Sequence, residues 1–214
     1  MTSMTSAGRL TNSGAIAGIL FDMDGVIVHQ RLDFLAIKRE IWGDTDGYIL
    51  ERMATLGGEA LARAEAILER HETAAAMGAT ATDGVLSFLS WMEARGLRRG
   101  IVTRNSRKSV EIVLERLGLR FDAVVTREDA PPKPAPDPVL LACRRIGLQP
   151  TQVLFVGDFE FDVLSGRRAG TGTVLLRGET QRSSEHADLI VDSLADLRRA
   201  LEGPAGDGGT GAPH

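Results

Sequence analysis

The sequence predicts an α/β fold, a doubly wound parallel sheet, from two observations. Short apolar segments alternate with segments of helical periodicity along most of the chain, and several apolar segments are uniform. Uniformly apolar strands are covered on both faces, and strand–helix alternation is typical of parallel sheets. A third observation is a purely helical stretch at residues 29–80, which interrupts the alternation and predicts a small all-helical insertion after the first strand.

The predicted strands are short apolar runs, and helical repeats lie between them. The strands are residues 16–21, 100–103, 123–125, 153–156, 173–176 and 188–191. Apolar residues recur at i, i+3, i+4 and i+7 and are followed by a glycine stop in residues 85–92, 110–117 and 139–146. A last helix is predicted over residues 194–201, with Ser193 in place to cap it.

Residues 29–80 carry three predicted helices, at 34–42, 47–55 and 59–77. A helical block placed directly after the first strand would sit over the carboxyl edge of the sheet, which is the position of a lid. The predicted organisation is a core domain of residues 15–28 and 81–202 with a cap of residues 29–80. The tails, residues 1–14 and 203–214, are rich in Ser, Thr, Gly and Pro and are predicted to be disordered.

Composition narrows the class of protein. The 214 residues include 43% hydrophobic and 25% charged residues, an ordinary globular mixture, and the net charge of −4 argues against a nucleic-acid binder. We find no apolar run of about 18 residues and no signal-peptide core, so the expected location is cytoplasmic. Cys143 is the only cysteine, which excludes an intrachain disulfide, and we expect it in the core.

The most informative segment is FDMDGVIV at residues 21–28. Asp22 and Asp24 follow a predicted strand and, being two residues apart, begin on the same face, while Gly25 permits a sharp turn. Ligands of open α/β sheets bind at the carboxyl ends of strands. Such a pair can bind a divalent cation, and one carboxylate can attack an electrophile while the other moves a proton. A calcium-loop fragment or a solvated turn is the alternative.

Three more segments place polar side chains at strand ends or helix starts. Thr103 ends a strand, where its hydroxyl and the following amides suit a phosphate, or it belongs to an ordinary N-cap. Lys133 lies in the proline-rich stretch PPKPAPDP as a fixed positive charge, or as a solvated linker residue. Asp158 and Asp162 follow the strand at 153–156 and suit a cation, or they cap a helix.

In order and spacing, these segments resemble the haloacid dehalogenase (HAD) superfamily over roughly residues 15–200. DMDG matches its first motif, Thr103 its second, Lys133 its third, and GDFEFD its GDxxxD fourth motif. An insertion between the first and second motifs resembles the C1-capped subgroup, which includes phosphoglycolate phosphatases and β-phosphoglucomutases. The resemblance implies a Rossmann-like core and a phosphoric monoester hydrolase.

The resemblance also implies catalytic roles. Asp22 would be the nucleophile that forms an aspartyl-phosphate, and Asp24 would protonate the leaving oxygen and then activate water. Thr103 would hydrogen-bond the transferring phosphoryl group, and Lys133 would neutralise Asp22 and the phosphate. The physical logic agrees, because a carboxylate and a phosphate repel each other unless cations offset their charge.

The implied cofactor is Mg²⁺, held by the Asp22 carboxylate, the Asp24 backbone carbonyl and Asp158. Asp162 would orient the cation shell or Lys133. Mg²⁺ prefers few carboxylates together with waters and phosphate oxygens, which matches this ligand set.

One position departs from the commonest pattern of the subgroup. Many C1 phosphatases carry asparagine directly after the motif-II threonine, whereas this chain has Arg104, with Asn105 next. A guanidinium so close to the phosphoryl site could pair bidentately with a second anionic group of the substrate. We therefore assign Arg104 and Asn105 to substrate binding; the alternative is that Arg104 points to solvent.

The leading functional prediction is a Mg²⁺-dependent phosphatase that hydrolyses a small phosphorylated metabolite, without nucleic-acid or membrane partners, as a monomer or weak homodimer. A phosphomutase of the β-phosphoglucomutase type is the nearest alternative. A mutase must shield its aspartyl-phosphate from water, which favours a larger cap than residues 29–80. A third alternative is a HAD fold used only for binding or regulation.

Overall fold

The computed structural model describes residues 16–177 and 186–203, so the tails predicted at residues 1–14 and 203–214 lie outside the described residues, apart from Gly203. The core is a six-stranded sheet in the order β5-β4-β1-β6-β7-β8, in which every neighbouring pair is parallel. The strands are β1 (Gly18–Phe21), β4 (Arg98–Val102), β5 (Ala123–Val125), β6 (Val153–Gly157), β7 (Gly172–Leu176) and β8 (Leu189–Val191). This confirms the predicted fold class.

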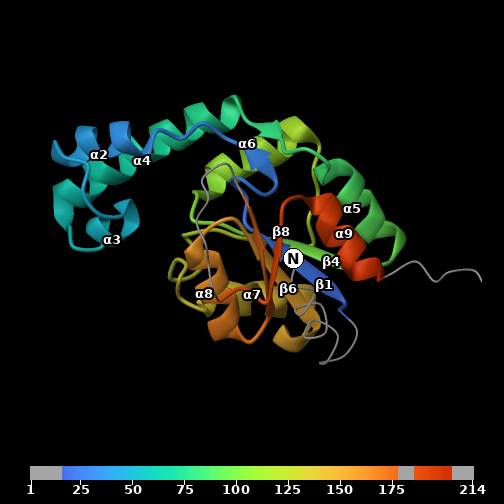
Figure 1. The fold of residues 1–214 in the computed structure, drawn as a ribbon. Coiled ribbons are helices and arrows are strands. Elements are labelled where there is room, and N and C mark those ends of the chain that lie inside the picture. The colour runs from blue at the N-terminus through green and yellow to red at the C-terminus, as the bar shows by residue number, and fades with distance from the viewer. Residues whose placement is uncertain (1–15, 178–185, 204–214) are drawn as a thin grey trace, which may run out of the picture.

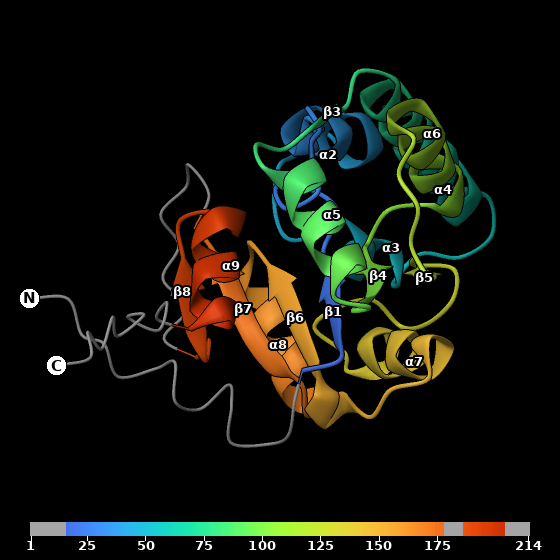
Figure 2. The same ribbon diagram turned by 90° about the vertical axis from the view of Figure 1, so that its right-hand side faces the viewer.

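Helices cover both faces of the sheet (Figures 1 and 2). They are α5 (Val85–Ala94), α6 (Arg107–Leu117), α7 (Asp137–Ile146), α8 (Glu160–Ala169) and α9 (Leu194–Glu202), with a short 3₁₀ turn η1 (Pro150–Gln152) before β6. Alternate residues of β1 serve the two faces: Ile19 and Phe21 pack with α5, α6 and α9, whereas Leu20 packs with α7. Cys143 lies in the second cluster and is buried, as predicted.

The purely helical stretch forms a lobe of its own beside the core (Figure 1). Its helices are α2 (Phe34–Trp42), α3 (Ile49–Met53) and α4 (Gly58–Met77). They enclose a separate apolar cluster built on Ile37, Ile49, Met53, Ala64 and Leu68. We call the segment from α2 to the end of α4 the helical insertion.

A two-stranded antiparallel ribbon joins the insertion to the core. It consists of β2 (Val28–His29) and β3 (Thr80–Ala81), and the insertion leaves and re-enters through these two strands. Two-residue strands carry no periodicity, so the sequence did not predict them. The helix predicted at 47–55 is shorter than expected because Gly47 adopts a left-handed φ of 60°.

Among residues 16–177 and 186–203, no helix combines the length and apolar character needed to cross a membrane.

Candidate active site

The central strands bring the predicted motifs to one edge of the sheet. Phe21, the last residue of β1, lies level with Ile101 of β4 and Val156 of β6. Each strand is followed at once by a polar side chain: Asp22 after β1, Thr103 after β4 and Asp158 after β6. Parallel pairing therefore converts three distant sequence positions into one cluster at the carboxyl edge.

Two glycines allow the acidic side chains to approach one another. Gly25 has a left-handed φ of 75°, and a Cβ there would lie 2.1 Å from Oδ2 of Asp158. A Cβ at Gly157 would likewise lie 2.1 Å from Cβ of Asp162. A larger residue at Gly25 would push apart the turn after β1 and the loop after β6, and one at Gly157 would displace the side chain of Asp162. The sequence thus specifies close packing of the first and fourth motifs.

Lys133 is the buried cation of the site. Its side chain is 2% exposed, and Nζ lies 2.7 Å from Oδ1 of Asp22 and 2.6 Å from Oδ1 of Asp162. Nζ also donates to the carbonyl oxygen of Val102 at 2.9 Å, so its three hydrogens have three acceptors. Burial disfavours the charged amine, but the Asp162 and Asp22 carboxylates outweigh this, and the pKa of Lys133 lies above its usual value.

The remaining carboxyl groups are crowded and desolvated. Burial, followed by the charge of Asp22, raises the pKa of Asp24 to about 7 and that of Asp158 to about 8. Burial also raises the pKa of Asp22, against the lowering influence of Lys133. Burial and mutual repulsion therefore disfavour the ionised forms of these carboxyl groups, although Lys133 lies close to them.

The site fits a divalent cation. Carboxylate oxygens of Asp22, Asp158 and Asp162 lie within 4.8 Å of one another, and hard oxygen donors suit Mg²⁺. Asp22 and Asp162 both pair with Lys133, and Asp162 is the more buried of the two, at 3% exposure against 14%. A cation bound here would favour the ionised forms of these carboxyl groups.

The loop between β4 and α6 carries the second motif. Thr103 is buried, and its Oγ1 accepts a hydrogen bond from the Asn105 amide at 3.2 Å. Asn105 donates from Nδ2 to Oδ2 of Asp24 at 2.7 Å, while Oδ1 of Asp24 is buried and has no hydrogen-bond partner within the described residues. Asn105, assigned to substrate binding from the sequence, thus holds Asp24 in the structure.

Two positions of Arg104 were considered from the sequence, one facing the substrate and one pointing to solvent. In the structure its side chain instead pairs with a residue of the insertion. Its Nη2 lies 2.9 and 2.7 Å from the two carboxylate oxygens of Glu51 in α3, a bidentate pair. Nη1 donates to the carbonyl oxygen of Lys133, and the guanidinium lies 5.1 Å from the ring centroid of Phe161. The side chain is 24% exposed. It joins the insertion to the loops of the second, third and fourth motifs.

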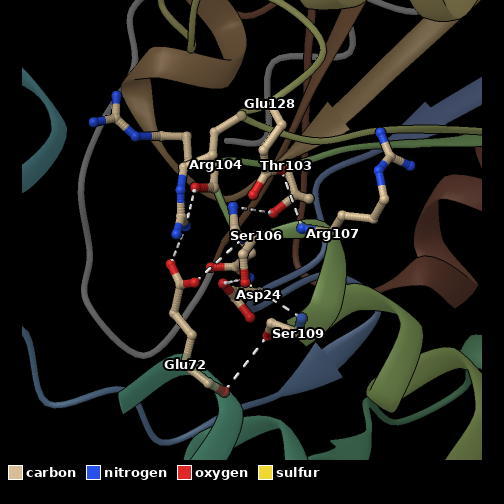
Figure 3. Close-up of polar contacts among 10 residues, drawn as sticks. Asp24, Glu72, Thr103, Arg104, Ser106, Arg107, Ser109 and Glu128 are labelled. Carbon is tan, nitrogen blue, oxygen red and sulfur yellow. Dashed lines mark hydrogen bonds and ion pairs between the residues drawn. The ribbon is translucent and has the colours of Figure 1, made fainter. Parts of the chain in front are cut away.

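Sequence reasoning missed the residues through which the insertion touches the site. Tyr48 packs on Phe161, with ring centroids 4.8 Å apart, and Glu51 meets Arg104. Glu72 of α4 is 2% exposed and contacts the start of α6 (Figure 3). The spacing of residues in α4 could have indicated that Glu72 is buried. Glu72 lies at a four-residue interval after Ala64 and Leu68 and before Ala76, in the stripe that faces inward.

Comparison with known proteins agrees with this geometry. The family described as haloacid dehalogenase-like hydrolase matches residues 19–176. A haloacid dehalogenase-like hydrolase domain-containing protein of Arabidopsis thaliana is 30% identical over 94% of this chain and 90% of its own length. An N-acetylmuramic acid 6-phosphate phosphatase of Pseudomonas aeruginosa is 30% identical, over 87% of this chain and 95% of its own.

The fold is shared with solved structures of lower identity. A hydrolase from Pseudomonas syringae superposes with a TM-score of 0.72 at 21% identity, over 87% of this chain and 98% of its own. The insertion between β1 and β4 is where the motif order predicts the cap of a C1-capped member. The chain belongs to the haloacid dehalogenase-like hydrolases, which confirms the family predicted from its four motifs.

Proposed function

We propose that this hydrolase is a Mg²⁺-dependent phosphatase that cleaves a small phosphorylated metabolite through an aspartyl-phosphate on Asp22. The observation that carries the proposal is the carboxylate pair on Lys133. Asp22 and Asp162 both bind its Nζ, yet the Asp22 side chain is 14% exposed and that of Asp162 only 3%. Asp22 is therefore the carboxylate that a substrate can reach, and Asp162 is the one that holds the lysine.

The chemistry divides into two displacements. In the first, a carboxylate oxygen of Asp22 forms a bond to phosphorus as the ester P–O bond breaks, and Asp24 gives its proton to the leaving oxygen. In the second, water attacks the phosphorus and Asp24 takes a proton from it. The Asp22–phosphorus bond breaks, and the products are an alcohol, inorganic phosphate, the Asp22 carboxylate and Asp24 protonated as at the start.

The contacts of Asp24 support this proton transfer. Asn105 fixes its Oδ2 at 2.7 Å, which leaves the buried Oδ1 as the oxygen that carries the proton. It comes two residues after Asp22, directly before the turn at Gly25. Lys133 keeps Asp22 oriented, and Thr103 lies at the end of the neighbouring strand, where its hydroxyl can donate to a phosphoryl oxygen.

Asp22, Asp158 and the backbone carbonyl of Asp24 would hold the Mg²⁺. When bound, the ion supplies positive charge against the phosphoryl oxygens. Lys133, from the loop between β5 and α7, supplies a second positive charge beside Asp22.

We further propose that residues 29–80 act as the cap of this site. The support is the contact of Tyr48 and Glu51 with residues that flank the second and fourth motifs. A small phosphorylated substrate is supported by the named relative, which is a phosphatase of a phosphorylated sugar. A phosphatase is favoured over a mutase because the insertion is three helices, one of them only five residues long.

Release of inorganic phosphate from a panel of phosphorylated sugars, sugar acids and an aryl phosphate tests the proposal, with Mg²⁺ and with EDTA. We expect Mg²⁺-dependent phosphate release from at least one sugar phosphate. An isomeric phosphorylated product without free phosphate would instead indicate a mutase. No turnover of any compound, the aryl phosphate included, would contradict enzymatic function.

A further inference from the structure

Glu72 is a carboxylate buried in the contact between the helical insertion and the core. It lies in α4, is 2% exposed, and pairs through Oε1 with the guanidinium of Arg127, whose side chain is 16% exposed. Its Oε2 accepts the backbone N–H of Ser106 at 3.3 Å, at the N-terminus of α6 (Figure 3). Burying a carboxylate without partners is strongly destabilising, so we expect the side chain of Glu72 to keep these contacts in the folded protein.

Glu72 and its partner Arg127 contact the phosphate-binding loop, which we define as residues 103–106. Ser106 ends the loop and caps α6 by accepting from the Ser109 amide at 3.3 Å. Arg127 follows β5 and donates from its backbone N–H to the Asn105 carbonyl at 3.3 Å. Its Nη1 lies 3.4 Å from the Arg104 carbonyl oxygen. Glu72 and Arg127 together therefore contact the loop at three consecutive residues.

The contact crosses the junction of the two lobes. Glu72 precedes β3 and so belongs to the insertion, whereas Ser106 and Arg127 belong to the core. The other insertion carboxylate on this helix that reaches α6 is different in kind: Glu69 pairs with Lys108 at 2.6 Å, and these side chains are 46% and 61% exposed. Exposed ion pairs contribute little to stability, so the Glu69–Lys108 pair is a suitable control for the buried Glu72–Arg127 pair.

The loop positions two groups of the proposed reaction. Thr103 lies at the phosphoryl site, and Asn105 holds Asp24. A displacement of the loop by a fraction of an ångström would misplace both groups, and misplacement of about 1 Å can cost roughly 100-fold in rate.

We propose that Glu72 is a positioning residue which, through Arg127 and the Ser106 amide, holds the phosphate-binding loop in its working geometry while the insertion is docked on the core. Its effect on rate rests on the proposed phosphatase function. The insertion thereby contributes to the reaction without touching the reacting atoms. The loop is ordered by Glu72 only when the insertion is docked on the core.

The test compares Glu72→Gln, Arg127→Gln and the double variant with Glu69→Gln as the matched control. With a substrate identified from the panel, Glu72→Gln should lower kcat by about 10- to 100-fold and change KM by less than about threefold, as expected for lost positioning. The double variant should be no worse than the poorer single variant, because the two side chains act as one unit. Glu69→Gln should match wild type.

Hydrogen–deuterium exchange of residues 103–109 gives a readout that does not depend on turnover. Exchange there should be faster in Glu72→Gln and Arg127→Gln than in wild type, and unchanged in Glu69→Gln. Equal exchange in all four proteins, or a kcat of Glu72→Gln within twofold of Glu69→Gln, would overturn the inference. If Glu72→Gln does not fold, Arg127→Gln decides it from the core side. Absence of turnover in wild type would overturn the proposed function, whereas the exchange comparison still decides the role of Glu72.

Discussion

The ion pairs of the candidate site and those within the helical insertion differ in burial. At the site, Lys133 and Asp162 are 2% and 3% exposed and lie in contact at the end of the sheet. The insertion keeps its own ion pairs at the surface, as in Asp44–Arg52, whose side chains are 44% and 26% exposed. Buried charges are costly but fixed in position, which is what a reacting centre needs, whereas exposed pairs tolerate movement. The difference is consistent with our proposal that the reacting groups belong to the core.

The two regions meet where α4 packs against α6 and where α3 reaches the loops of the site. Tyr48 packs on Phe161, Glu51 pairs with Arg104, and Glu72 contacts the start of α6. All three core contacts lie beside the candidate catalytic and metal-binding residues, and none is itself one of those residues. The insertion can therefore influence substrate choice and loop order, while the charge arrangement at Asp22 is completed by core residues. Each of the following predictions tests this division.

The largest effect is expected from the core. Asp22→Asn should reduce turnover to below about 1% of wild type, because a carboxamide is not a usable nucleophile. The fold should persist, since the change keeps the size of the side chain and most contacts of Lys133. Steady-state phosphate release and the far-UV circular dichroism spectrum check this together. Activity clearly above that level in a folded variant would remove Asp22 from the nucleophile's role.

The next effect concerns the metal. Asp158→Ala removes a hard oxygen ligand but leaves Thr103 and Lys133, so it should raise the half-saturating Mg²⁺ concentration by about 10-fold or more. The KM for substrate at saturating Mg²⁺ should change much less. A titration of activity with Mg²⁺ measures both values. If the half-saturating concentration equals that of wild type, Asp158 is not a ligand and the division of roles among the core carboxylates is wrong.

The sequence predicted those features that depend on neighbours along the chain. The acidic turn after β1 follows from an apolar strand ending in DMDG, and the carboxyl edge of a parallel sheet gathers such ends wherever they occur. The partner of Arg104 was not predictable in this way. Glu51 lies 53 residues away in the sequence, and their contact depends on how the insertion docks. Glu72 could have been singled out as a carboxylate within an apolar stripe.

A moderate effect is expected where the insertion meets the core at Arg104. The carboxylate of Glu51 occupies both Nη2 contacts that we assign to a second anionic group of the substrate. Arg104→Ala should then raise KM several-fold for doubly anionic substrates and little for uncharged sugar monophosphates. Glu51→Gln, which weakens the competing pair, should lower KM for the same doubly anionic substrates.

Measuring KM of Arg104→Ala and Glu51→Gln for doubly anionic substrates and for uncharged sugar monophosphates tests this role of Arg104. Equal effects of Arg104→Ala on both substrate classes would leave Arg104 as a structural link between the insertion and the Lys133 loop. In that case Glu51→Gln should change stability and leave the order of substrate preference as it is in wild type.

The smallest effect lies within the insertion itself. Hydrogen bonds from Arg52, and then from the Asp46 amide, lower the pKa of Asp44 from its usual 3.8 to about 2. A carboxyl with a lowered pKa stabilises the folded state fully above its unfolded pKa and loses that contribution as the pH falls through its folded pKa. Asp44→Asn should therefore lower the melting temperature slightly and equally at pH 7 and pH 5, and the difference from wild type should shrink at pH 3 and below.

Trp42 can report this change from within the insertion, because the Arg52 guanidinium lies 4.1 Å from the centroid of its ring. In a Trp91→Phe background, which removes the tryptophan of the core, fluorescence melts of Asp44→Asn isolate the response of the insertion. Glu65→Gln, a change of the same kind at an exposed position of α4, serves as the control and should give no pH-dependent difference. A difference for Asp44→Asn that grows in acid would contradict the assigned pKa. A loss of melting temperature as large as that caused by removing a buried ion pair of the core would contradict our expectation that the exposed Asp44–Arg52 pair contributes little to stability.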